Sequence, residues 1–364
     1  MIRGTVAYAR GKSHIRSGKS NQDSFYIMPL EDEGLFIAAA GDGCGSCKHA
    51  EIASSLAVER VCHFIRENFP IDATPISVKS MLRTAFNRAL KDIYQEAEKN
   101  NNSIRDYQTT LMVVVYHYKS QSGYIASVGD GCVYALKQDG TIIPLTTRQQ
   151  TEEGYVIPLS AGYGFWEIFE LTEDYASLVI TTDGVADKIQ NASLDDGIYV
   201  PLMMLFDPHV IKHLKRTSVN FSKLFADPHS VPRQVIYNAI YRALRKDYGF
   251  SKATTLNIVS SIKHGALIET IKSIHDDITA VCLYNTEFLP KPRAAKYYME
   301  PDWKGIHAKQ QKLLYPYLET DKPDTADKNE EKVLTERTSK DGANAIRKIK
   351  LILSKLLKKV KKDV

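Results

Sequence analysis

Residues 111–137 have the sequence LMVVVYHYKSQSGYIASVGDGCVYALK, and this stretch decides the fold that we expect. It contains three short runs rich in β-branched and aromatic residues, at 111–118, 123–130 and 132–137, which are typical of strands. The connection Lys119–Ser122 suits an antiparallel hairpin and is too short for the crossover that joins parallel strands. Gln138–Gly140 gives the third run a turn of the same kind. The sequence therefore predicts antiparallel sheets.

Further strand and helix patterns lie on both sides of this stretch. Residues 49–69 and 78–98 carry apolar side chains at helical spacing, and Pro70 follows the first of these segments. Residues 191–270 are helical and polar, and 271–284 return to a strand whose partner must lie far back in the sequence. We therefore interpret 191–270 as an excursion from the sheet within one domain. The other strand candidates are 4–10, 24–28, 34–40 and 177–183.

Composition bounds the class of protein. The 364 residues are 43% hydrophobic and 25% charged, so the chain can bury a substantial core, either in one large α/β domain with an appendage or in two modest domains. No run reaches the roughly 18 apolar residues that a membrane span needs, and the first residues lack the apolar core of a signal peptide. The cysteines are few and odd in number, unlike a secreted disulfide framework, so a cytoplasmic location is predicted. They are Cys44, Cys47, Cys62, Cys132 and Cys282.

The net charge of +5 is concentrated at the C-terminus. Residues 347–362 hold eight Lys and Arg and no acid. Without them and Asp363, 40 basic and 42 acidic residues nearly cancel. A nearly neutral body argues against a nucleic-acid-binding surface on the main domain.

Three segments follow the main domain, which we place at residues 1–286. Residues 287–317 are rich in Tyr and Pro and are expected to pack on the body, and 318–342 are charged and are expected to form a flexible linker. Residues 343–364 are expected to form a basic amphipathic helix, because the apolar residues within 346–362 recur at intervals of three and four. Three interpretations of this helix stay open: docking on an acidic partner, lying on an anionic membrane surface, or packing back on the body.

One pattern recurs along the main domain: an apolar strand runs into an aspartate. The instances are AAAGDG with Asp42, ASVGDG with Asp130 and VITTDG with Asp183, while Asp276-Asp277 precedes the strand ITAVCLY. Any one of these is most simply a turn, because Asp and Gly dominate turns. Several carboxylates that converge need a cation to cancel their repulsion, and all-oxygen ligands suit Mg²⁺ or Mn²⁺. Taken together with Asn21-Gln22-Asp23, the four instances favour a metal site.

The order of these motifs resembles the type 2C, metal-dependent Ser/Thr protein phosphatases, in their compact bacterial branch. The resemblance covers residues 3–285 and implies an α+β fold, a four-layer α-β-β-α sandwich of two antiparallel sheets flanked by helices, here with a helical insertion. The motifs that carry it are NQD (21–23), GDGCGSCKHAE (41–51), QTTLMVVV (108–115), VGDGCVY (128–134), TTDGVAD (181–187) and DDITAV (276–281).

The resemblance also implies a site for two ions, Mg²⁺ or Mn²⁺. Asp42 would bridge them, the Gly43 carbonyl would bind one of them, and Asp183 and Asp276 would complete the first ion. Asp23 would hold water on the second, and Asp130 with Asp183 matches the pair that binds a third, weaker ion. Asp42, Asp183 and Asp276 would thus act through a metal-activated water, with no side-chain nucleophile.

Four positions depart from the family pattern. Cys44 stands where the family often has a proton-donating His, and Gln22 stands where many members have Glu. Asp277 replaces a frequent Asn, and we place Gln22, Cys44 and Asp277 behind the ligands. The usual phosphate-binding arginine has no equivalent, so Arg16 or Lys19 is the candidate, Arg16 being favoured for its bidentate reach.

Three functions compete. The first is hydrolysis of phosphoserine and phosphothreonine in a phosphorylated protein substrate, opposing a Ser/Thr kinase. The second is a binding or regulatory module that keeps the fold but is catalytically weak or inactive, and the departures at Gln22, at Cys44 and at the phosphate-binding arginine favour it. Retention of Asp23, Asp42, Asp183 and Asp276 argues against it, because a scaffold has no reason to keep repelling carboxylates. The third is hydrolysis of small phosphate esters at the same site.

Overall fold

The computed structural model describes residues 1–118, 121–189, 200–226, 231–263 and 274–300, with the single residues 271, 302, 305 and 308. Nearly all of these lie in one compact unit, Met1–His307. The predicted linker 318–342 and the predicted basic helix 343–364 lie outside the described residues. None of the described helices is long and apolar enough to cross a membrane.

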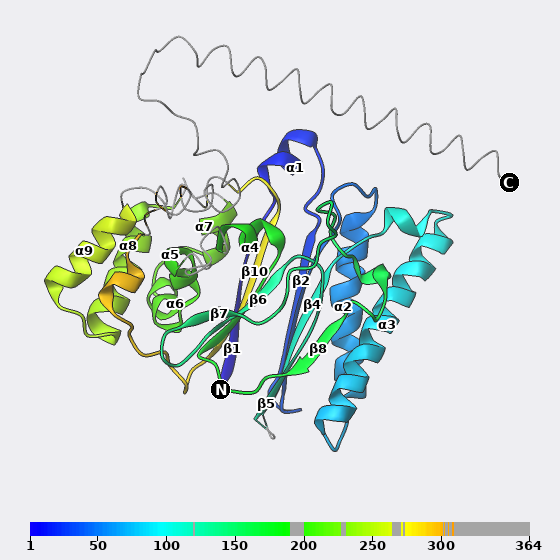
Figure 1. Cartoon of the computed structure of the whole chain (residues 1–364), viewed down its shortest axis with the longest axis horizontal. Coiled ribbons are helices and arrows are strands. Elements are labelled where there is room, and N and C mark those ends of the chain that lie inside the picture. Colours follow the sequence, from blue (N-terminus) through cyan, green and yellow to red (C-terminus); the bar gives the residue numbers. More distant parts are fainter. Residues whose placement is uncertain are drawn as a thin grey trace, which may run out of the picture. The chain divides into compact units, whose positions relative to one another are not determined.

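Two five-stranded sheets form the centre of this unit (Figure 1). The first sheet has the order β1-β10-β9-β6-β7 and the second β2-β3-β4-β5-β8, and every neighbouring pair is antiparallel. The first sheet consists of β1 (Ile2–Ala9), β6 (Cys132–Leu136), β7 (Ile142–Pro144), β9 (Ser177–Thr181) and β10 (Ile278–Asn285). The second consists of β2 (Asp23–Leu30), β3 (Leu35–Asp42), β4 (Leu111–His117), β5 (Ser122–Val128) and β8 (Glu167–Glu170).

The second sheet is covered by α2 (Ala50–Asn68) and α3 (Pro75–Lys99). Strand β3 is apolar on both faces because both are buried: Ala38 packs between the sheets, whereas Ala39 packs against the helices. Helix α3 begins with two standard N-terminal signals. The Thr74 hydroxyl accepts a hydrogen bond from the Ser77 N–H at 3.2 Å, and Pro75 is the first helical residue.

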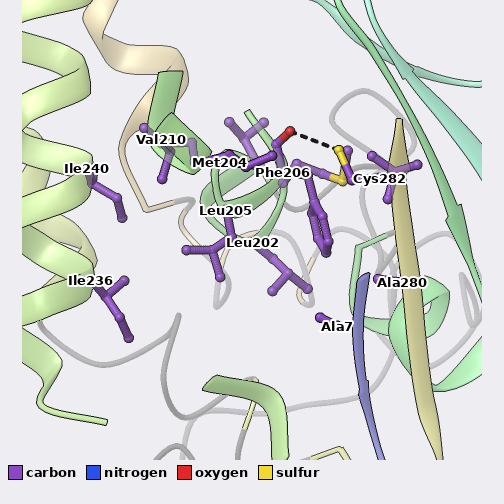
Figure 2. Close-up of a cluster of buried hydrophobic side chains, with 14 of the residues drawn as sticks. Ala7, Leu202, Met204, Leu205, Phe206, Val210, Ile236, Ile240, Ala280 and Cys282 are labelled. Carbon is purple, nitrogen blue, oxygen red and sulfur yellow. Dashed lines mark hydrogen bonds between the residues drawn. The ribbon is translucent and has the colours of Figure 1, made fainter. Parts of the chain in front are cut away.

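The first sheet is covered by the helices that follow β9 in the chain. Figure 2 shows Leu202 and Phe206 lying between Ile236 of α8 and the strand residues Ala7 and Cys282. The Cys282 thiol donates a hydrogen bond to the Phe206 carbonyl at 3.4 Å, so this buried sulfur is satisfied within the core. The helices are α4 (Asp183–Ile189), α5 (Val200–Met203), α6 (Pro208–Leu214), α7 (Phe221–Ala226), α8 (Arg233–Arg242) and α9 (Lys252–Lys263).

The predicted four-layer sandwich of antiparallel sheets and helices is confirmed. Strand β10 pairs with β1 and β9, so its partners do lie far back in the sequence. Farther along, Tyr298 is buried and stacks on Tyr248 with ring centroids 5.9 Å apart, so the described part of 287–317 contacts the insertion helices. The elements that the sequence patterns missed are short: α1 (Lys12–Ser17), β7 and β8.

The aspartates lie at one end of the sandwich, because the strands next to them in the chain begin or end there. Asp23 opens β2 and is the register partner of Asp42, which ends β3. Between β5 and β6 the chain leaves the second sheet for the first through Gly129-Asp130-Gly131. Gly129 has φ +116°, and a Cβ on Gly131 would lie 2.6 Å from the Thr181 carbonyl oxygen, so both positions require glycine.

Candidate metal centre

Three carboxylates from different elements meet at this end of the sandwich. One oxygen each of Asp42, Asp130 and Asp183 lies within 4.8 Å of the other two. Asp42 ends a strand of the second sheet, Asp130 lies in the crossing between sheets, and Asp183 begins α4 behind the first sheet. Asp183 was predicted as the end of a strand; the strand stops at Thr181 and the aspartate is the first helical residue.

Asp23 and Asp276 flank this cluster. Asp23 is buried, and the Thr182 hydroxyl donates a hydrogen bond to its Oδ2 at 2.7 Å. Its Oδ1 has no partner among the described residues. The Asp276 side chain is 54% exposed, and its charge acts on Asp42 and Asp183. All five aspartates predicted from the sequence therefore lie in one region, with Asp276 at its solvent side.

Burial and mutual repulsion make these groups hard to ionise together. Burial raises the pKa of Asp42 well above its ordinary value, and the charges of Asp23 and Asp183 raise it further. Burial, with the charges of Asp130 and Asp276, raises the pKa of Asp183 to about 7. Burial likewise raises the pKa of Asp23. A bound cation would reverse these shifts, because it stabilises the ionised carboxylates.

Threonines fix the backbone and side chains of the aspartates. The Thr110 Oγ1 accepts a hydrogen bond from the Asp42 N–H at 2.9 Å, and the Thr109 hydroxyl donates to the Asp42 carbonyl, also at 2.9 Å. Thr182 both donates to Asp23 and accepts from the Thr279 N–H at 3.0 Å. The role of Thr182 was not predicted, although the second threonine of TTDG stands directly before Asp183.

Gly43 continues the loop after Asp42 in a place that excludes any side chain. Its N–H donates to the Gln22 carbonyl at 3.1 Å, and a Cβ would lie 2.5 Å from the Ala50 carbonyl oxygen. Besides Asp23 Oδ1, two other buried oxygens point to a missing partner: Gln22 Oε1 and Asp183 Oδ1 are unpaired among the described residues. The donors are all oxygens and the charge is negative, so the residues present fit a hard divalent cation such as Mg²⁺ or Mn²⁺.

Asp277 does not join the cluster and instead organises the chain beside it. It is 1% exposed; its Oδ1 accepts from the Gly11 N–H at 2.6 Å, and its Oδ2 accepts from the Gln22 N–H at 2.6 Å and from His14 Nδ1 at 2.7 Å. One carboxylate thus holds the segment that carries α1 and leads into Asp23. His14 Nε2 lies 3.9 Å from Asp276 Oδ1, on the side of the cluster.

The two predicted phosphate-binding residues are placed differently. Lys19 Nζ donates to the Gly45 carbonyl at 2.5 Å, which brings its charge onto the loop that follows Asp42. Arg16 is exposed on α1.

Cys44 is in the same loop, and its N–H donates to the Gln108 carbonyl at 3.0 Å. The Cys47 N–H donates to the Cys44 carbonyl at 2.8 Å, so the CGSC sequence forms a tight turn with two free thiols. Burial, with a smaller contribution from Cys47, raises the pKa of the Cys44 thiol to about 12. A thiol in this state is a poor nucleophile.

Comparison with known proteins gives a family and several structural neighbours. The family model described as Protein phosphatase 2C matches residues 10–220. A bacterial serine phosphatase is similar at 14% identity, with 80% of this chain and 100% of that chain covered and a TM-score of 0.47. The Mycobacterium tuberculosis serine/threonine phosphatase PstP/Ppp is similar at 15% identity, with 79% and 99% covered and a TM-score of 0.46. The catalytic domain of PstP in complex with two manganese ions is similar at 15% identity, with 78% and 97% covered and a TM-score of 0.43. No curated protein sequence matches significantly.

Proposed function

The chain belongs to the protein phosphatase 2C family, and we propose that it hydrolyses phosphoserine and phosphothreonine esters in proteins with the help of two divalent cations, Mg²⁺ or Mn²⁺. The observation that carries the proposal is the convergence of Asp42, Asp130 and Asp183 within 4.8 Å. These carboxylates repel one another, and burial raises the pKa of Asp42 and Asp183. A protein keeps such an arrangement at a cost in stability, which is typical of a functional site.

The residues that would hold the cations come from both sheets. Asp42 would bridge the two ions, with Gly43 offering its carbonyl. Asp183 and Asp276 would complete the coordination of the first ion, and Asp23 would bind the second ion through water. Bound cations would supply an activated water for attack at phosphorus and positive charge for the phosphoryl oxygens.

The protein's own side chains set the geometry around that chemistry. Thr109 and Thr110 hold the Asp42 backbone, and Thr182 orients the Asp23 carboxylate. Lys19 donates to the Gly45 carbonyl, and from this loop it would contact a substrate phosphate. The position that often holds a proton-donating His is Cys44, whose half-buried thiol has a raised pKa, so the leaving alkoxide would take its proton from water.

Turnover of p-nitrophenyl phosphate, followed by a phosphothreonine peptide, tests this proposal. We expect activity with Mn²⁺ that is abolished by EDTA and by Asp42→Ala. Asp106→Ala is the matched control, because Asp106 is a partly exposed aspartate that pairs with Lys48 at 4.0 Å outside the cluster. Absence of Mn²⁺-dependent turnover in the folded wild-type protein would refute the catalytic proposal.

A second candidate function is a binding module that keeps the fold, and the half-buried Cys44 thiol, whose pKa is raised, favours it. Calorimetry separates the two: cation uptake without turnover on any phosphoester identifies the module, whereas turnover identifies the enzyme. We propose that the partner in either case is a phosphorylated protein whose kinase is of the Ser/Thr type. Preference for the peptide over p-nitrophenyl phosphate would distinguish a protein substrate from a small ester.

A further inference from the structure

Asp130 is held by a segment that has no other part in the proposed mechanism. The Gln150 side-chain N–H donates to Asp130 Oδ2 at 2.9 Å, and Arg148 Nε donates to the Asp130 carbonyl at 2.5 Å. The other end of the Arg148 guanidinium lies 2.6 Å from Asp187 Oδ1. The backbone and side chain of Asp130 are therefore both fixed by residues 148–150.

Gln149 holds the glycine that precedes Asp130. Its N–H donates to the Gly129 carbonyl at 2.8 Å, and its Oε1 accepts from the Gly129 N–H at 3.2 Å. Gly129 has φ +116°, so these two bonds hold the turn in a conformation that other residues rarely adopt.

The segment is anchored at its far side as well. Gln150 forms a β-bridge with Val156, and the Ile157 N–H donates to the Gln149 carbonyl at 3.1 Å. The Gln149 side chain donates to the Phe165 carbonyl at 2.7 Å. These bonds make 148–150 a braced support, which we name the Asp130 clamp.

The clamp bonds both the side chain and the carbonyl of Asp130, a residue that also belongs to the carboxylate cluster. Asp130 is 6% exposed, and one of its oxygens lies within 4.8 Å of oxygens of Asp42 and Asp183. An amide donor on one oxygen of a carboxylate fixes the rotation of the group and leaves lone pairs free for a cation. A braced carboxylate is a better ligand than a mobile one, because less freedom is lost on binding.

We propose that Gln150 and Arg148 are positioning residues that aim Asp130 at a cation shared with Asp183, the weakest of the ions at this site. The inference rests on the proposed metal-dependent function, and it assigns to this chain's own side chains the control of the third ion. Loss of the clamp lowers the affinity for that ion alone, because Asp23, Asp42 and Asp276 receive no hydrogen bond from residues 148–150.

The test is Mn²⁺ binding by calorimetry on the full chain, with Gln150→Met and Arg148→Lys. Methionine keeps the length of glutamine and removes the donor. Lysine keeps the charge of arginine but cannot reach both the carbonyl and Asp187 with one nitrogen. Gln234→Met is the matched control, because Gln234 is an exposed glutamine that bonds Asn238 at 2.9 Å on α8.

We expect wild type to show a tight and a weak class of Mn²⁺ sites. Gln150→Met should weaken the weak class about tenfold or more, as is usual when a residue behind a ligand is removed, and leave the tight class within about twofold. Arg148→Lys should also weaken the weak class more than the tight class. Gln150→Glu, which sets a carboxylate against Asp130, should weaken it further, and Gln234→Met should change neither class.

Three results overturn the inference: both classes unchanged in Gln150→Met, both weakened equally, or wild type with a tight class only. Two unchanged classes would show that Gln150 does not position Asp130, and equal weakening would indicate a general structural role. A tight class alone in wild type would show that the weaker ion does not bind. Failure of wild type to bind any Mn²⁺ refutes the proposed function itself, and is therefore distinguished from failure of the inference.

Discussion

Asp277→Asn should destabilise this protein, although asparagine is the residue that related phosphatases often carry there. The carboxylate is 1% exposed and accepts three hydrogen bonds, from Gly11, His14 and Gln22. Asparagine offers one accepting oxygen and one donating amide group. Whichever way the amide turns, its N–H₂ faces a backbone N–H, of either Gly11 or Gln22, that cannot become an acceptor.

The cost follows from these contacts. A buried backbone N–H left without an acceptor costs about 1–3 kcal/mol, and hydrogen bonds to a charged group are worth about 1.5–3 kcal/mol against about 1 kcal/mol for neutral ones. Together these give about 3 kcal/mol of lost unfolding free energy. For a body of this size that corresponds to about 6 °C in Tm, at roughly 2 °C for each kcal/mol.

Thermal and urea unfolding of the metal-free protein in EDTA measures this change without cation binding. The matched control is Asp276→Asn, one residue earlier, whose side chain is 54% exposed and whose Oδ1 accepts from the Asp277 N–H at 2.8 Å. Asparagine keeps that acceptor and removes repulsion with Asp42, so Asp276→Asn should cost nothing measurable.

The His14 contact supplies a second check. In Asp277→Asn the imidazole can accept from the new amide, so His14→Ala should cost less in that variant than in wild type, with a coupling of about 1–2 kcal/mol. Equal unfolding of Asp277→Asn and wild type, within about 0.5 kcal/mol, would refute the reasoning that this carboxylate holds the N-terminal segment.

Three further predictions follow from the cluster. In the folded protein the pKa of Asp183 is raised from 3.8 to about 7. The metal-free protein should therefore lose up to about 4 kcal/mol of unfolding free energy from this group as the pH rises between those values. Urea unfolding in EDTA at pH 5 and pH 8 measures the loss, and the difference in unfolding free energy between the two pH values should be smaller in Asp183→Asn than in wild type. Gly43→Ala should abolish Mn²⁺-dependent turnover, because its Cβ would lie 2.5 Å from the Ala50 carbonyl oxygen, and turnover at the wild-type rate would contradict the predicted loop geometry. Thr182→Val removes the hydroxyl that orients Asp23 and should raise the Mn²⁺ dissociation constant about tenfold, whereas Thr182→Ser should stay close to wild type; calorimetry measures both.

The sequence predicted the central strands well because their signals are local. Runs such as 111–118 and 123–130 are apolar, β-rich and bounded by turns, and the connection between them is short. Helix α1 was missed because six residues are too few for a periodic pattern. It is held by contacts between distant residues, among them the Ser13 N–H bond to the His275 carbonyl at 2.9 Å.

In the candidate site, too, the residues with a local sequence signal were predicted and the others were not. The aspartates could be identified one by one, because each directly adjoins an apolar, strand-like run in the sequence. What surrounds them could not: the Asp277 bond to Gly11 joins residues 266 apart in sequence, and the Arg148 bond to Asp130 spans 18. Neither Gly11 nor Arg148 carries a local signal, because a glycine backbone N–H or an arginine in a loop is most often solvated.

The distribution of the carboxylates over both sheets connects the site to the stability of the sandwich. Asp23 and Asp42 belong to the second sheet, whereas Asp183 and Asp276 adjoin β9 and β10 of the first. Without cations, the repulsion among these groups acts across the boundary between the sheets, and it opposes the apolar packing of residues such as Ala38 and Val281. With cations it becomes an attraction across the same boundary. Cations that bind the folded chain but not the unfolded chain would therefore stabilise the fold by their binding free energy. A site built on one sheet alone would share this linkage but would add no attraction between the two sheets.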